Sequence, residues 1–327
     1  MRQLTIKELE RRAPDFDTAV RQTPDIDRFC SSSLWILPAW KAFLPDHRLW
    51  AHESDEGFAV LGIGDDRSLG TYVHPLEASW ALASPLVGPA PASLTRKFID
   101  LCRSTDLDWD ILFLSGINPD SVHFQELIRG FRGQFSLGLG PSSVRRVASL
   151  EGGVEGFLGR RSSKFRANLR RSRRRARDEG IEVEYFDKVS ADEAIDDLFE
   201  RALAIEHHSW KADADTGIID GPMKTFYRDM LPRLARRGAL RFLFLTLDGQ
   251  DIAYCFGGVF DDGFRGLQMS FHDDYRTHSP GSLAQLHMIE NLCDEGVDSY
   301  DLGSDMAYKQ RWAEAGIETM AVIVRRI

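Results

Sequence analysis

Apolar runs separated by short polar turns organise the chain between residues 241 and 302. Three runs rich in Phe, Leu and Tyr, at 241–247, 252–260 and 264–271, are separated by turns that contain Asp-Gly. Because both residues tolerate positive φ, such turns are typical of hairpins. The pattern predicts a meander of three antiparallel strands, then a helix over 282–295, then a short strand at 299–302.

A turn rich in Ser, Pro and Gly joins the third strand to the helix. It consists of Ser279, Pro280, Gly281 and Ser282. The first N–H groups of a helix lack backbone partners and carry partial positive charge, so a phosphate or a developing oxyanion can bind there. Gly281 lets such a ligand approach the backbone closely. The alternative is an ordinary connection in which Ser279 or Ser282 caps the helix.

The first half of the chain repeats part of this order with little sequence identity. Ser84-Pro85 precedes a predicted helix and a buried strand at 109–114, as Ser279-Pro280 precedes the later helix and strand. This similarity indicates two related α/β halves, and the glycine-rich residues 152–159 mark the border between them.

Near the start, residues 31–44 predict a buried helix broken at Pro38.

A strongly basic segment follows the border, from Arg160 to Arg177. It holds ten basic residues and no acidic one. Like charges repel, so we expect an anionic partner here, such as the phosphates of a cofactor, RNA or an acidic substrate. A solvated basic helix is the alternative. The segment lacks interleaved aromatic residues, which weakens the RNA interpretation because stacking on bases needs them.

Composition narrows the class of protein. The net charge of −9 argues against a protein whose whole surface binds a polyanion. No apolar run approaches the roughly 20 residues that span a bilayer, and the first residues lack the apolar core of a signal peptide. The four cysteines are scattered, which is typical of buried thiols in a reducing compartment. We therefore expect a cytoplasmic protein with no membrane span and no metal site.

Four features of the second half together resemble the GNAT acyltransferase fold. They are the basic segment with the strand after it, the sequence EHHSWK from Glu206 to Lys211, the turn at Ser279, and Tyr308-Lys309 followed by Trp312. Within that superfamily they are most similar to the acetyltransferases related to cellulose-biosynthesis proteins, and to the Fem-type aminoacyltransferases of peptidoglycan assembly. The resemblance covers residues 155–325 well and the first half weakly.

The resemblance implies an α/β (α+β) fold with tandem GNAT-like domains. Each is expected to be a mixed, largely antiparallel sheet flanked by helices. Residues 1–150 are expected to form a degenerate N-terminal copy, and residues 151–327 the catalytic domain.

The resemblance also implies a place for the acyl donor. Its pantetheine would lie between the strands at 264–271 and 299–302, with its pyrophosphate on the turn that follows the first of them. Arg276 and Gly281 match the family's turn pattern, whereas Ser279 stands where the first glycine is usual. Acyl-CoA is the expected donor, and a carrier-protein thioester or an aminoacyl-tRNA is the alternative. Donor binding is assigned to Arg276, Ser279, Gly281 and Ser282.

Acyl transfer to an amine needs a base and an acid. Tyr308 is placed to protonate the leaving group, although a packed aromatic residue is an equal alternative. His272 or Glu206 is the candidate general base, with a surface or satisfied histidine as the alternative for His272. Acceptor binding is assigned to His208, Trp210, Lys211, Asp301 and Lys309.

The predicted function is an N-acyltransferase. It would move an acyl group directly from a thioester donor to an amine of a small molecule or peptide. A tRNA-dependent aminoacyltransferase of the Fem type and a non-catalytic binding protein on the same fold are the alternatives.

Overall fold

The computed structural model describes residues 1–189, 191–209 and 217–326, in two compact units. One unit is Met1–Val144 together with Ile317–Ile327, and the other is Arg145–Gly316. The predicted division assigns everything after residue 150 to the second domain. The chain instead returns to the first unit at its end, because strand β13 (Glu314–Arg326) pairs with β6 (Ile111–Ile117).

The first unit has a largely antiparallel sheet in the order β1-β2-β3-β4-β6-β13. Only the β4–β6 pair is parallel, and the short strand β5 pairs with β3. Helix α5 lies beside α6, and the side chains of both belong to the core of this unit. The remaining elements are β1 (Arg2–Leu4), β2 (Arg48–Ser54), β3 (Gly57–Asp66), β4 (Gly70–Pro75), β5 (Leu86–Val87), α1 (Ile6–Arg11), α2 (Ala13–Gln22), α3 (Arg28–Ser31), α4 (Ser33–Phe43), α5 (Pro91–Ser104) and α6 (Val122–Phe131).

The predicted break at Pro38 is wrong. Helix α4 runs from Ser33 to Phe43 without interruption, with Pro38 inside it. Seven of its residues, from Ser33 to Ala39, are buried. Burial of this largely apolar helix offsets the backbone hydrogen bond that proline cannot donate.

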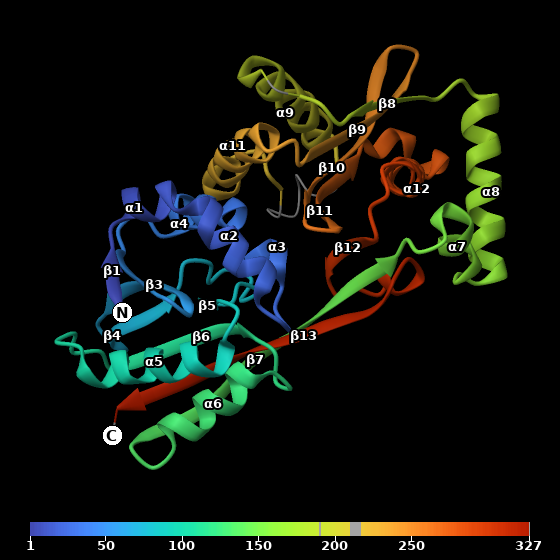
Figure 1. Ribbon diagram of the computed structural model, residues 1–327. Coiled ribbons are helices and arrows are strands. Elements are labelled where there is room, and N and C mark those ends of the chain that lie inside the picture. Colours follow the sequence, from blue (N-terminus) through green and yellow to red (C-terminus); the bar gives the residue numbers. More distant parts are fainter. Residues whose placement is uncertain (190, 210–216, 327) are drawn as a thin grey trace. The chain divides into compact units, whose positions relative to one another are not determined.

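The second unit has a sheet in the order β7-β12-β11-β10-β9-β8, in which β7 takes part with its last residues, from Arg145 to Ser149. Helix α12 packs against β9, β10 and β11, with α7 and α8 against its outer side, while α9 and α11 cover the opposite face (Figure 1). The elements are β7 (Phe135–Ser149), α7 (Gly153–Gly159), α8 (Ser163–Asp178), β8 (Glu182–Phe186), α9 (Asp192–His207), α11 (Gly221–Arg236), β9 (Leu240–Leu247), β10 (Gln250–Phe260), β11 (Gly263–Phe271), the 3-10 helix η1 (Asp273–His278), α12 (Pro280–Asp294), β12 (Ser299–Ser304) and the 3-10 helix η2 (Lys309–Arg311).

The predicted meander is confirmed. Strands β9, β10 and β11 pair antiparallel in sequence. Asp248 and Gly249 in the first turn have φ of 51° and 76°, and Asp261 in the second has φ of 60°. These are the left-handed conformations that Asp and Gly tolerate, so the local turn chemistry sets the hairpin register.

The strands of the two units pair in the same order. Strands β2, β3 and β4 form an antiparallel meander, helix α5 follows, and β6 then pairs parallel to β4. In the second unit β9, β10 and β11 form the meander, α12 follows, and β12 pairs parallel to β11. The predicted fold class is therefore confirmed: each unit is a mixed, largely antiparallel sheet flanked by helices.

Candidate functional site

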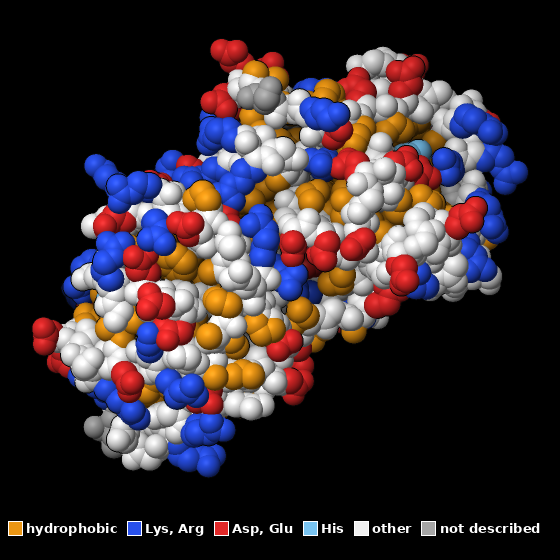
Figure 2. Space-filling model, viewed as in Figure 1, with side chains coloured by type: hydrophobic (Ala, Val, Ile, Leu, Met, Phe, Trp, Pro, Cys, Tyr) orange, Lys and Arg blue, Asp and Glu red, His pale blue; other side chains and the backbone are white. Residues whose placement is uncertain are grey.

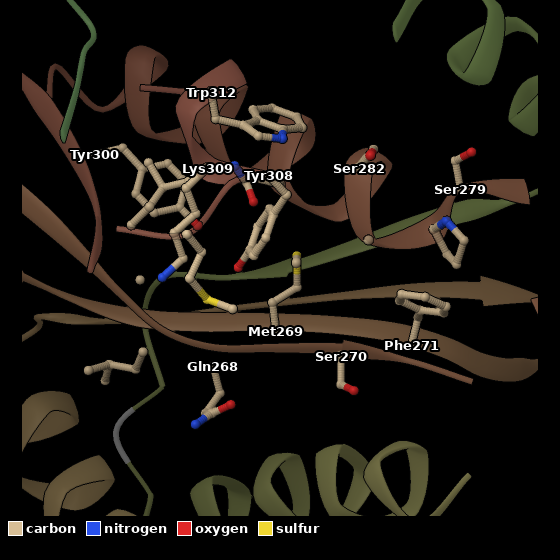
Figure 3. Close-up of a pocket in the computed structure, with 17 residues that line it drawn as sticks. Gln268, Met269, Ser270, Phe271, Ser279, Ser282, Tyr300, Tyr308, Lys309 and Trp312 are labelled. Atoms are coloured by element: carbon tan, nitrogen blue, oxygen red, sulfur yellow. The ribbon is translucent and has the colours of Figure 1, made fainter. Parts of the chain in front are cut away.

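Strands β11 and β12 separate soon after they meet, and a cavity opens between them. Their parallel pairing covers only Gly263–Arg265 against Ser299–Asp301. The cavity beyond has a volume of about 710 Å³ and is closed on one side by the start of α12 (Figure 3). We call it the cleft; its lining residues are Gly266, Leu267, Gln268, Met269, Ser270, Phe271, Ser279, Pro280, Gly281, Ser282, Gln285, Tyr300, Leu302, Met306, Tyr308, Lys309 and Trp312.

Alternate residues of β11 face the two sides of the sheet, as the twofold period of a strand requires. Met269 and Phe271 point into the cleft, toward Tyr308 and the start of α12 (Figure 3). Gln268 and Ser270 point to the opposite face, where Gln268 Nε2 donates a hydrogen bond to the Tyr227 hydroxyl at 3.2 Å. One wall of the cleft is therefore apolar side chain and strand backbone, which suits an extended, uncharged ligand.

The turn before α12 has a left-handed residue, and it is Ser279 rather than glycine. Its φ and ψ are 57° and 44°. Glycine adopts this conformation freely, so the backbone keeps the shape expected of a glycine at that position. Gly281 is buried in the first turn of the helix, and a Cβ there would lie 3.2 Å from Cδ1 of Phe271.

Few backbone donors at this turn are left for a ligand. Pro280 has no N–H, and those of Ser282 and Leu283 donate to Ser279 O at 3.0 Å and 3.2 Å. The first-turn donor left over is the N–H of Gly281. An anion bound here therefore needs cationic side chains beside the helix dipole.

A smaller, basic cavity adjoins the cleft at this point. It has a volume of about 370 Å³ and shares Ser279, Ser282, Tyr308 and Trp312 with the cleft. We call it the mouth of the cleft. Three arginines line it, two from α8 and one from η2: Arg171, Arg175 and Arg311.

Tyr308 and Lys309 are both in the cleft. The Tyr308 side chain is 39% exposed, and desolvation of its buried part raises the pKa of its hydroxyl above the usual value of 10. The Lys309 ammonium lies 5.8 Å from the centre of the Tyr308 ring, and it donates a hydrogen bond to Ser304 O at 3.0 Å. Trp312 is buried against Phe165 of α8, with ring centroids 4.9 Å apart, and fixes this segment to the helix.

Asp301 is the centre of a buried ion-pair group. Its Oδ2 accepts hydrogen bonds from Arg145 and from Arg265, each at 2.8 Å. Its Oδ1 accepts one from the N–H of Gly303 at 2.7 Å. The carboxylate of Asp301, in β12, thus links β7 and β11 through the two arginines. These contacts indicate a structural role in addition to the predicted acceptor binding.

The predicted base candidates lie in a second cluster, at the end of α9 and β11. Glu206 is fully buried and accepts a hydrogen bond from the Tyr254 hydroxyl at 2.9 Å. The rings of His208 and His272 stack with centroids 4.6 Å apart. None of these three predicted residues lines the cleft.

Two predicted residues lie outside the described part of the chain, and Arg276, like Asp301 and the residues of the second cluster, does not line the cleft. Trp210 and Lys211 are among the residues that the structure does not describe. Arg276 is in η1, where it is exposed and pairs with Asp273 at 3.0 Å. The structure therefore brings together Ser279, Gly281, Ser282, Tyr308 and Lys309.

The sequence interpretation missed Arg175 and Arg311 as lining residues. Arg175 lies in the predicted basic segment, but the sequence gives no sign of which arginine faces the turn. Arg311 follows Tyr308 by three residues, a spacing that places both on one side of a helical turn. That spacing is the signal in the sequence from which Arg311 could have been predicted as a neighbour of Tyr308.

Comparison with known proteins agrees with this geometry. Residues 163–310 match the acetyltransferase (GNAT) domain family. The match includes α8, the turn before α12 and every residue that lines the cleft except Trp312. No curated protein matches the chain.

Solved structures extend the likeness to the whole chain. FemX is 11% identical, covers 98% of this chain and 97% of its own, and gives a TM-score of 0.64. A conserved protein of unknown function from Bacteroides thetaiotaomicron VPI-5482 is 14% identical over 96% of this chain and 97% of its own, with a TM-score of 0.57. The C-terminal domain of a putative lysylphosphatidylglycerol synthetase from Agrobacterium fabrum is 14% identical over 93% and 91%, with a TM-score of 0.56.

At these identities the solved structures show the fold alone. Residues 163–310 match the GNAT acetyltransferase domain, the whole chain shares its fold with FemX, and kinship with the cellulose-biosynthesis branch stays a prediction. Among the described residues, no three His, Cys, Asp or Glu side chains are grouped so that they could hold a metal ion. Within the same residues, every helix is too short or too polar to cross a membrane.

Proposed function

We propose that this protein is an N-acyltransferase that moves an acyl group from a thioester to an amine. The observation that carries this proposal is the cleft between β11 and β12, with the start of α12 and three arginines at its mouth. A phosphopantetheine thioester has the matching form, because an anionic phosphate is followed by a long, largely uncharged arm.

In this proposal the arm of the donor lies along residues 267–271 of β11. The N–H of Gly281 and the guanidinium groups of Arg171 and Arg175 hold the phosphate oxygens, since charge-assisted hydrogen bonds are the strong ones. Both acyl-CoA and an acyl carrier protein present this phosphopantetheine arm.

The chemical step is direct transfer. The amine nitrogen attacks the thioester carbonyl, the C–N bond forms, and the C–S bond breaks. Tyr308 protonates the departing thiolate, and its raised pKa keeps the phenol protonated at neutral pH. The amine must first lose a proton, and Glu206 and His272, near the end of α9, are the proposed bases for an acceptor that enters from that face.

Aminoacyl transfer from tRNA is the second candidate function. The observation that favours it is the positive charge of α8, which borders the mouth of the cleft. The same geometry would then protonate an alkoxide instead of a thiolate. A binding protein without turnover is the third candidate.

We further propose that the protein works in the cytoplasm and that the first unit is a degenerate copy without a donor site. The proposal rests on the pairing order that both units share. The proposed location is supported by the four cysteines of the protein, which are free thiols, as expected of a reducing compartment.

One experiment separates the three candidate functions. The purified protein is screened by thermal shift and calorimetry against acetyl-CoA, longer acyl-CoAs and tRNA, because a ligand of the folded state raises the melting temperature. Each ligand that binds is then supplied in its loaded form, as acyl-CoA or as aminoacyl-tRNA, with a panel of amines and peptides, and the product is measured by mass spectrometry. Amide formed from acyl-CoA supports the proposal; binding without product under any condition supports a binding protein.

A further inference from the structure

The exposed face of α8 carries more positive charge than nearby acidic residues neutralise. Three of its arginines pair with acidic side chains of α8, α12 or the residue after α8: Arg173, Arg175 and Arg177. Three more are exposed and form no hydrogen bond or ion pair with any other residue that the structure describes: Arg170, Arg171 and Arg174.

The spacing of these arginines is unfavourable for the helix itself. Arg170 and Arg174 are four residues apart, as are Arg171 and Arg175, so each pair lies side by side on the helix surface. Like charges at this spacing oppose helix formation. An acidic partner bound along this face would relieve the repulsion.

This face also forms one wall of a groove with an apolar edge. The groove has a volume of about 930 Å³ and lies between α8 and the start of β8. Val183 of β8 is 39% exposed and lines it together with Ile181. Lys and Arg side chains gather along the right-hand edge of the molecule, over α8 (Figure 2). Basic groups beside exposed apolar groups are typical of a surface that binds an acidic protein.

Arg171 connects this groove to the cleft. It lines both the groove and the mouth of the cleft. The mouth in turn shares Tyr308 and Ser282 with the cleft. A partner seated on α8 would therefore sit beside the entrance through which the donor's arm must pass.

We propose that the donor is an acidic carrier protein that docks on α8 and inserts its phosphopantetheine thioester into the cleft. This inference rests on the proposed function and names the donor for the same site. In the step the carrier's C–S bond breaks and the amide C–N bond forms. The carrier leaves as a free thiol, with its proton from Tyr308, and the amine's proton passes to the base.

Nucleic acid fits this surface less well. The basic groups lie on one helix of 16 residues, while the whole chain carries a net charge of −9, which repels a long polyanion elsewhere. The aromatic residue of α8, Phe165, packs against Trp312 and is not presented for stacking on bases.

The test compares the binding of carrier proteins, CoA and tRNA to wild type and to two double variants. Holo acyl carrier protein, holo peptidyl carrier protein, free CoA and tRNA are titrated by calorimetry, at 150 mM salt, into wild type and into Arg170→Gln/Arg174→Gln. Both substituted residues line the groove and not the mouth of the cleft. Arg67→Gln/Arg132→Gln, two exposed arginines of the first unit, is the control for net charge.

We expect one holo carrier protein to bind the wild type, and the α8 variant to weaken that binding at least tenfold. CoA binding should change less than threefold, and the control should match wild type. The proposal is overturned if neither holo carrier binds, or if the α8 variant weakens CoA binding as much as carrier binding. It is also overturned if tRNA binds the wild type and the variant loses the binding of tRNA alone. Transfer from acetyl-CoA to amines is measured separately, so a failed acyltransferase and a failed docking surface give different results.

Discussion

Arg175 of α8 donates a hydrogen bond from Nη1 to the carbonyl oxygen of Thr277, with a distance of 2.8 Å. Thr277 lies two residues before Ser279, the left-handed residue that precedes α12. The bond ties the basic helix to the turn at the mouth of the cleft. It explains how α8, which precedes the meander in sequence, becomes part of a site at the start of α12.

The first prediction follows from that contact. Arg175→Gln should weaken donor binding about tenfold or more, because it removes both a cation at the mouth and a charge-assisted hydrogen bond of roughly 1.5–3 kcal/mol. Calorimetric titration with CoA measures the effect. Arg177→Gln is the matched control, since Arg177 is on the same helix but does not line the mouth. Equal affinity for both variants and wild type would remove Arg175 from the donor site.

The second prediction concerns the size of residue 281. A methyl group there meets Phe271 at 3.2 Å, and the branches of valine would extend further into the cleft. Donor affinity should therefore fall in the order wild type, Gly281→Ala, Gly281→Val, with the largest loss at least tenfold. Melting temperatures serve as the control for folding. A Gly281→Val protein that is stable and still binds CoA normally would show that the donor does not contact this turn.

The third prediction concerns Tyr308. Tyr308→Phe should lower kcat by about 100-fold, the lower range for a general acid, with little change in donor binding. Burial raises the pKa of the Tyr308 phenol, so its protonated form persists above pH 10. Loss of this proton should therefore not lower the kcat of the wild type at any pH below 10. Tyr275→Phe is the control, since that hydroxyl bonds Gln250 outside the cleft. An unchanged kcat in Tyr308→Phe would assign protonation to another group.

The fourth prediction separates stability from binding at Asp301. Asp301→Asn leaves Arg145 and Arg265 without the carboxylate that they share, and breaking a buried pair costs on the order of 3 kcal/mol. Urea unfolding should show that loss. Asp305→Asn, which removes an exposed partner of Arg146, should change stability little. If Asp301→Asn keeps its stability but loses acceptor binding, the acceptor role is the correct one.

Local patterns in the sequence predict the elements of the second unit well. The Asp-Gly turns, the apolar runs of β9 to β11 and the Ser-Pro-Gly start of α12 each depend on a few neighbouring residues, so the chain shows them directly. The helix through Pro38 was not predictable, because burial by distant segments outweighs the local effect of proline. The return of β13 to the first unit is likewise set by pairing with β6, some two hundred residues earlier in the chain.

The site was predictable only in part, for the same reason. The turn and Tyr308 carry local signals, and both line the cleft. Which arginine of α8 faces the turn depends on how that helix packs against α12, and the sequence of a uniformly basic helix does not show this. Asp301 was expected to bind the acceptor from its place in the predicted strand at 299–302, whereas its two arginine partners come from β7 and β11, which the sequence does not show.

The most direct test of the central claim is a crystal structure of this protein with acetyl-CoA bound. The account predicts pantetheine density along β11 between residues 267 and 271, phosphate oxygens within hydrogen-bond distance of the Gly281 N–H and of Arg171 or Arg175, and the sulfur near the Tyr308 hydroxyl. Acetyl-CoA bound outside the cleft, or a cleft that stays empty at saturating acetyl-CoA and with a holo carrier protein, would contradict it.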